Sequence, residues 1–184
     1  MVTINASTTA GLVMTSDLSG TLSLQSNGVA VTVPAVAGTM MVSGNMPAFS
    51  AWQSVGTTAN NSTWTKIACN IKEFDTNSCY DNSTNYRFTP TVAGYYQVNS
   101  SVQINAIAAS EATIAIYKNG SAYKQGLDII ATTMYQLTVN ALVYLNGSTD
   151  YIETYIYQAS GTSKTIQGNT LSNTYFQAAM IRGA

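Results

Sequence analysis

A long run of alternating side chains constrains this chain most. From Tyr96 to Asn105, every second residue is apolar or small, and most of the residues between them are Gln or Asn. One set is Tyr96, Val98, Ser100, Val102 and Ile104, and the other is Gln97, Asn99, Ser101, Gln103 and Asn105. Successive side chains of a β-strand point to opposite faces, so this pattern predicts a strand that is buried on one side only.

Similar runs continue through the chain after Thr63, separated by turn residues. Further strands are predicted at 112–117, 135–145, 151–157 and 174–182. The first of these ends at Asn119-Gly120, a pair that suits the positive φ angles of a tight hairpin turn, so a return strand is expected near Ala122. No helical pattern interrupts the runs. Many short strands with turn residues between them predict an all-β sandwich.

Residues 1–46 differ from the rest of the chain. They hold two short apolar alternations, at 21–24 and 29–33, in a background of Gly, Ser, Thr and Ala. This is too little apolar bulk for an independent core. We therefore expect an N-terminal arm, residues 1–46, that packs against copies of itself, the body or another protein, and a body at 47–184. The candidate docking residues of the arm are Leu12, Leu22, Leu24, Val31 and Val33.

The chain carries few charges. Only 8% of its residues are charged and the net charge is -1, whereas 46% are hydrophobic. The Lys and Arg residues are scattered singly and cannot neutralise a run of phosphates, so nucleic-acid binding is disfavoured. Little like-charge repulsion opposes edge pairing of a β-rich monomer, so the composition favours an oligomer. The N-terminus resembles neither a signal peptide nor a membrane span, and we expect synthesis in the cytoplasm and no membrane insertion.

The chemistry of common enzymes is missing. The chain has no histidine, which removes the commonest general base and the most frequent zinc ligand. Two carboxylates can hydrolyse a glycoside, but the carboxylates here lie in no recognisable motif. Those considered are Glu73, Asp75, Asp81, Glu111, Asp128, Asp150 and Glu153. We expect no enzymatic activity and no cofactor.

Two smaller questions concern metal binding and cysteine pairing. Asp75, Asp81 and Asp128 could supply oxygen ligands for calcium, although turn capping is favoured because Asp suits turns. Cys69 and Cys79 could bridge neighbouring strands, but free buried thiols are favoured in the absence of a secretory signal.

The spacing of aromatic residues and a glycine connects the body to a known family. Phe88 is followed by five residues, then Gly94 and Tyr96, and Phe176 lies in the closing strand. From Pro47 to Ile181 the chain resembles the C1q-like members of the tumour-necrosis-factor (TNF)-like jelly-roll superfamily. Phe88 is expected to plug the core, and Gly94 to let the backbone turn tightly before Tyr96 enters the sheet.

The resemblance implies a ten-strand, two-sheet jelly roll that forms a compact homotrimer. One face of the strand at 151–157 is a candidate part of the trimer interface, because tyrosines bury area while they form hydrogen bonds. Its residues are Tyr151, Glu153, Tyr155 and Tyr157.

The N-terminal arm is similar in composition to the N-terminal segments of bacteriophage tail-fibre and head-decoration proteins, notably at 11–20 and 24–28. The favoured hypothesis is a trimeric structural protein on the surface of a phage virion, made in the cytoplasm of the host bacterium. Its role would be capsid decoration (cement) or a short head fibre, with the arm docked on the particle and the jelly roll projecting outward. An extended arm spans at most roughly 160 Å, which suits a knob seated on the capsid.

Two alternatives remain open from the sequence. The chain could be a tail-fibre or adaptor tip that binds a host protein or glycan, with Trp52 or Trp64 stacked on a sugar. It could also be a secreted C1q-like ligand, although no signal peptide is recognisable.

Overall fold

The computed structural model describes residues 22–26, 29–33, 41, 43–105, 110–131, 135–169 and 173–184. The chain divides into two compact units, Met1–Met40 and Met41–Ala184. The second unit is the body.

In the first unit, the described residues form two paired strands. Strand β1 (Leu22–Ser26) is antiparallel to β2 (Val29–Val33). Leu22 lies opposite Val33, and Leu24 lies opposite Val31. Four of the five candidate docking residues therefore lie in one strand pair, and Leu12 lies outside the described residues.

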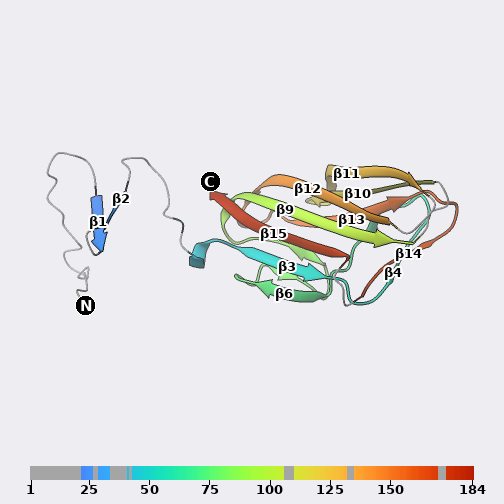
Figure 1. Ribbon diagram of the computed structural model, residues 1–184, viewed down its shortest axis with the longest axis horizontal. Helices are drawn as coiled ribbons and strands as arrows, with labels where there is room; N and C mark the ends of the chain where they lie inside the picture. The colour runs from blue at the N-terminus through green and yellow to red at the C-terminus, as the bar shows by residue number, and fades with distance from the viewer. Residues whose placement is uncertain are drawn as a thin grey trace. The chain divides into compact units, whose positions relative to one another are not determined.

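The body is a sandwich of two antiparallel sheets (Figure 1). In the first sheet, the central strand β9 pairs with β12 on one side and with β15 and β14 on the other. The sheet continues from β15 through β3 to β6, and from β14 to β4. Its seven strands are β3 (Ala48–Trp52), β4 (Thr57–Ala59), β6 (Ile71–Asp75), β9 (Ala93–Ile104), β12 (Tyr135–Asn146), β14 (Lys164–Ile166) and β15 (Tyr175–Gly183).

The second sheet runs in the order β11-β10-β13-β8-β7, and β5 also pairs with β13. Its six strands are β5 (Thr65–Lys66), β7 (Tyr80–Asp81), β8 (Arg87–Phe88), β10 (Ser110–Lys118), β11 (Ser121–Ala131) and β13 (Ile152–Gln158). Asn119 and Gly120 both have positive φ and join β10 to β11 in the expected tight turn.

The prediction of an all-β, two-sheet jelly roll is confirmed. The two sheets contain six and seven strands, which together exceed the expected ten. The excess comes from short segments of only two or three residues, namely β4, β5, β7, β8 and β14. The described part of the chain also holds one 3-10 turn, η1 (Ser43–Asn45). Among the described residues, no helix is long and apolar enough to cross a membrane.

Aromatic rings form the centre of the body's core. The ring of Phe49 stacks on that of Tyr80 at 4.4 Å and on that of Phe88 at 4.6 Å between centroids, and Phe88 meets Tyr96 edge-on at 5.6 Å. Phe176 meets Phe49 edge-on at 5.0 Å. Stacked and edge-on pairs each add to the free energy gained by burying the rings. The three signature aromatics Phe88, Tyr96 and Phe176 thus lie together in the core.

The expected role of Gly94 is wrong. It does not make a tight turn, because it lies inside β9, paired with Leu145 on one side and Gly183 on the other. A Cβ at this position would lie 2.3 Å from Cε of Met180 and 2.4 Å from the carbonyl oxygen of Arg182. Glycine is needed here because neighbouring atoms occupy the space of a side chain.

Residues between 41 and 46 belong with the body. Met41 packs against the core, and the carbonyl of Gly44 accepts a hydrogen bond from Nδ2 of Asn77 at 3.1 Å. The division between the units accordingly falls after Met40, whereas the sequence placed it after Met46.

Candidate functional site

The outward side of the seven-stranded sheet is the first candidate surface. Burial alternates along β9 and β12, and the residues that face away from the core carry mainly amides, hydroxyls and a few large apolar groups. Pairing aligns them in rows, with Asn140 opposite Asn99 and Asn99 opposite Gln177. We call this surface the amide face; its residues are Ser50, Trp52, Tyr95, Gln97, Asn99, Ser101, Gln103, Gln136, Thr138, Asn140, Leu142, Tyr144, Tyr175, Gln177 and Ala179.

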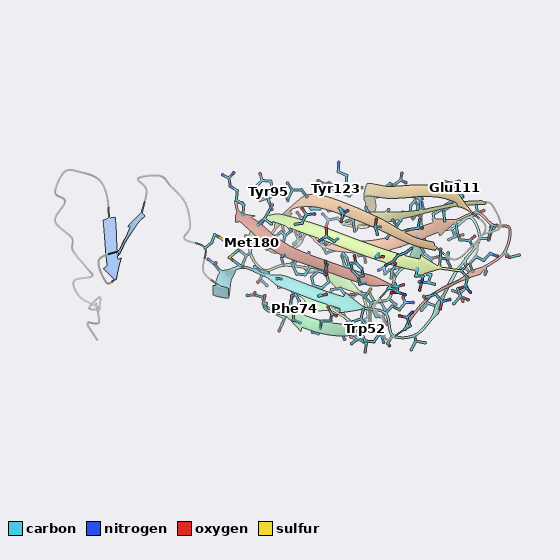
Figure 2. The ribbon with its side chains drawn as sticks, viewed as in Figure 1. Trp52, Phe74, Tyr95, Glu111, Tyr123 and Met180 are labelled. Carbon is cyan, nitrogen blue, oxygen red and sulfur yellow. The ribbon has the colours of Figure 1, made fainter. Side chains whose placement is uncertain are left out.

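Along β9 and β12 the amide face carries no charged side chain, and several of its residues are large and apolar. Charges lie at its margins, where Arg182 is opposite Tyr95 and Glu73 accepts a hydrogen bond from Ser50. Leu142 is 51% exposed, and Tyr144 and Tyr95 are about as exposed. Phe74 adds a further exposed ring on the neighbouring strand β6, opposite Ser50 of β3 (Figure 2). Exposed apolar groups without charges, among side chains that can form hydrogen bonds, are typical of the centre of a protein interface.

The outward side of the six-stranded sheet holds the predicted trimer-interface residues. Tyr155 and Tyr157 alternate with buried residues along β13, whereas Glu153 is itself buried. The short strand β5 pairs with β13 and places Lys66 opposite Tyr155. Tyr151 lies just before β13, where the guanidinium of Arg87 sits 4.5 Å from its ring centroid. The four residues thus already contact partners within the chain, and their role in a trimer interface stays a prediction.

The same side carries a cluster of four aromatic rings. Tyr117 stacks on Tyr155 at 4.1 Å between centroids, and Trp64 lies 5.7 Å from Tyr117 and 5.6 Å from Tyr157. Ala115, directly opposite Tyr155 in the sheet, is fully buried. Tyr117 and Tyr157 therefore hold the ring of Trp64 on the outward side of the sheet.

An ion pair fixes the segment that carries Trp64. Nζ of Lys66 lies 2.5 Å from Oε1 of Glu153 and also donates a hydrogen bond to the carbonyl of Asn85. Burial by itself lowers the pKa of Lys66, but the hydrogen bond and the charge of Glu153 together outweigh it and raise the pKa above its usual value. The pair therefore holds β5 against β13.

Beside Trp64 the surface forms a hollow of about 260 Å³. We call it the Trp64 hollow; its lining residues are Trp64, Glu111, Thr113, Gln125, Gly126 and Tyr157. Glu111 and Thr113 lie two residues apart on β10, and Thr113 is directly opposite Tyr157 on β13. The hollow thus combines two aromatic rings with a carboxylate, an amide and a hydroxyl.

A bulge in β11 shapes one wall of this hollow. Gly126 and Leu127 together oppose the single residue Ile114 of β10, because the register shifts between Thr113 and Ala115. A Cβ on Gly126 would lie 2.2 Å from the backbone carbonyl oxygen of Thr138. Only glycine allows β11 to approach β12 so closely at this point.

The structure separates the two tryptophans that the sequence proposed for stacking on sugars. Trp52 lies on the amide face opposite Tyr175, whereas Trp64 lines the hollow on the other sheet. Sequence reasoning did not connect Glu111 and Gln125 with Trp64, since they come from strands far apart in the chain. A glycine inside a predicted strand, Gly126, was the one local signal of an irregularity there.

The proposed calcium ligands are occupied by hydrogen bonds where the structure describes them. Both oxygens of Asp81 accept hydrogen bonds from the turn at 83–85, first of all from the backbone N–H groups of Thr84 and Ser83, and these hold its pKa well below the usual range. Asp75 accepts hydrogen bonds from the N–H groups of Cys79 and Tyr80. The side chain of Asp128 lies outside the described residues. Within the described ranges, no three acidic or cysteine side chains converge as a metal site would require.

Most other carboxylates of the body are engaged in structural pairs. Asp150 accepts a hydrogen bond from Nδ2 of Asn119 and pairs with Lys118 at 2.9 Å, and these two contacts lower its pKa. Oε2 of Glu73 accepts a hydrogen bond from the hydroxyl of Ser50. Both cysteines are free and buried, as favoured from the sequence, and burial raises the pKa of the Cys69 thiol.

Comparison with solved structures identifies the fold. Murine APRIL at pH 5.0 aligns with a TM-score of 0.56 and 8% identity over 74% of this chain and 99% of its own. The Eiger TNF from S. frugiperda aligns with a TM-score of 0.55 and 7% identity over 76% and 93%. The PRD1 vertex protein P5 aligns with a TM-score of 0.51 and 15% identity over 74% and 97%.

At these identities the likeness establishes the fold alone: the body is a TNF-like jelly roll. No family model matches the sequence, and no curated protein matches it.

Proposed function

We propose that this chain is a non-enzymatic, homotrimeric structural protein of a phage particle, which acts as a capsid decoration (cement) protein or a short head fibre. Its N-terminal arm docks on the particle, and the jelly roll projects from the virion surface. The likeness of the body to the PRD1 vertex protein P5 supports a place on a virus particle. The composition of the arm supports the same role.

The amide face is the observation that carries the self-association. Its central strands β9 and β12 carry no charge on this side, and it exposes Tyr95, Leu142 and Tyr144 to water. Contact with other copies of the chain would bury these side chains, and the amide rows would supply hydrogen bonds between copies. A surface poor in charge can be desolvated without the large cost of burying unpaired ions.

Light scattering and sedimentation test this proposal together. We expect the purified chain to be a trimer and to sediment with phage capsids that lack their decoration protein. A variant lacking residues 1–40, the whole of the first unit, should remain a trimer and stay in the supernatant. A full-length trimer that leaves the capsids bare would overturn the virion role, and a monomer would overturn the assembly.

A pair of substitutions locates the interface. Leu142→Arg places a charge on the amide face, and Val55→Arg places the same charge at a 67% exposed position in a loop. The first variant should dissociate to a monomer, because an unpaired buried charge is costly. The second should keep the mass of the wild type. Equal behaviour of the two variants would place the interface elsewhere.

A further inference from the structure

The Trp64 hollow has the chemistry of a site for a small polar ligand. Two aromatic rings, Trp64 and Tyr157, lie with their centroids 5.6 Å apart on one side. Glu111, Gln125 and Thr113 provide hydrogen-bonding groups around them. Binding sites for small molecules combine apolar walls with a few placed polar groups in this way.

The size of the hollow limits the ligand to about one ring. Its volume of about 260 Å³ lies just below the range of roughly 300–1,000 Å³ for sites that take drug-sized molecules. The hollow is open to solvent, so a ring bound in it can remain attached to a longer chain outside. A terminal or branching unit of a polymer fits this geometry.

The polar groups select a ligand rich in hydroxyl groups. A carboxylate such as that of Glu111 accepts hydrogen bonds and donates none when ionised, and the amide of Gln125 does both. The flat apolar surfaces of Trp64 and Tyr157 suit the C–H face of a sugar ring, since aromatic side chains join an apolar body to a polar tip.

The charge of the hollow excludes anionic ligands. Among the lining residues whose side chains the structure describes, Glu111 is the one charged group, and it is negative. A phosphate, a uronic acid or a sialic acid would face this carboxylate without a cation to offset the repulsion. Nucleotides are disfavoured for the same reason.

From these observations we propose that the Trp64 hollow binds one neutral pyranose unit of a cell-surface glycan. Glu111 and Gln125 hold its hydroxyl groups, and Trp64 and Tyr157 contact its C–H face. This extends the proposed role at a virion surface, because a particle that displays many copies can hold a host glycan through weak, repeated contacts. A single site is expected to bind one ring with a dissociation constant on the order of 1 mM.

Tryptophan fluorescence measures this binding directly. The chain has two tryptophans, so the variant Trp52→Phe leaves Trp64 as the only one. Titration of this variant uses the methyl glycosides of glucose, galactose, mannose and N-acetylglucosamine as neutral probes, and N-acetylneuraminic acid as the anionic probe. At least one neutral probe should change the emission of Trp64 in a saturable way, and the anionic probe should not.

Two variants assign the binding to the hollow. Glu111→Gln removes the charged acceptor from an exposed position and keeps its shape, and it should weaken binding about tenfold. Trp64→Ala should abolish the binding as seen by ligand-detected NMR. Val55→Ala, which does not change a lining residue of the hollow, should bind as the wild type does.

Several results would overturn the proposal. The first is the lack of a saturable response to every neutral probe. The second is binding of N-acetylneuraminic acid as tight as that of the neutral probes. The third is an affinity that stays unchanged in both Glu111→Gln and Trp64→Ala. Dissociation of the oligomer by Glu111→Lys would also overturn it, because the hollow would then be an interface between copies. The mass and the capsid binding of Glu111→Gln separate the sugar-binding proposal from the proposed virion role. If only the sugar-binding proposal is wrong, both of these properties should match those of the wild type.

Discussion

Replacement of Phe88 by alanine tests the account of the core. The side chain is fully buried, and its ring contacts Phe49 at 4.6 Å and Tyr96 at 5.6 Å between centroids. Removing a buried phenylalanine ring costs about 3–5 kcal/mol in the free energy of unfolding, from lost transfer energy and from the cavity that remains. We expect Phe88→Ala to be in the upper part of this range, because two aromatic contacts are lost as well.

The assay is thermal unfolding at a fixed protein concentration, since the stability of an oligomer depends on concentration. The Tm should fall by roughly 8–20 °C, from a loss of about 4–5 kcal/mol and about 2–4 °C per kcal/mol for a chain of this size. Phe88→Leu, which keeps much of the volume, should cost less. Val55→Ala, at a 67% exposed position, should cost no more than about 0.5 kcal/mol. A loss below about 1 kcal/mol for Phe88→Ala would refute this description of the core.

Three further predictions follow from the contacts described above. Gly94→Ala should destabilise the fold by about 1–3 kcal/mol because of the close approach of Arg182, whereas Gly44→Ala, with open space around its Cβ, should be nearly neutral in urea unfolding. The folded state holds the pKa of Asp81 below its usual 3.8, so the contribution of this residue to stability is present above pH 3.8 and is lost as the pH falls further. Asp81→Asn should therefore flatten the decline in the free energy of unfolding at acid pH. An unchanged pH profile in this variant would contradict the assignment. The Cys69 thiol should react with a thiol reagent at pH 8 only after unfolding, and rapid reaction of the native protein would show that it is accessible.

The sequence predicts the long strands well because their patterns are local. Tyr96 to Ile104 alternate as expected except at Ser101, which is fully buried, and the Asn119-Gly120 turn joins two strands. Both features depend on neighbours in the chain. Strands of two or three residues, such as β5 and β8, are too short to show a period. They exist because partner strands supply their hydrogen bonds.

The candidate surfaces depend on contacts that no local pattern reveals. Trp64 meets Tyr117 and Tyr157 because β5, β10 and β13 lie in one sheet, although they are far apart in the sequence. The alternation did identify Gln97 and Asn99 as outward-facing. It did not show that they share rows with residues of β12 and β15, since this requires the register of the sheet.

The two surfaces belong to different sheets of one body. The amide face lies on the seven-stranded sheet, and the Trp64 hollow lies on the six-stranded sheet. Figure 2 shows Tyr95, on the amide face, and Glu111, in the hollow, toward opposite ends of the sandwich. Association through the amide face would leave the hollow open, whereas an interface at Tyr155 and Tyr157 would cover it.

The mass of the purified full-length protein in solution tests the central claim most directly. Light scattering should give three times the 19.5 kDa of one chain, unchanged on moderate dilution. A mass of one chain at the same concentration would contradict the proposal that the amide face joins copies of this protein.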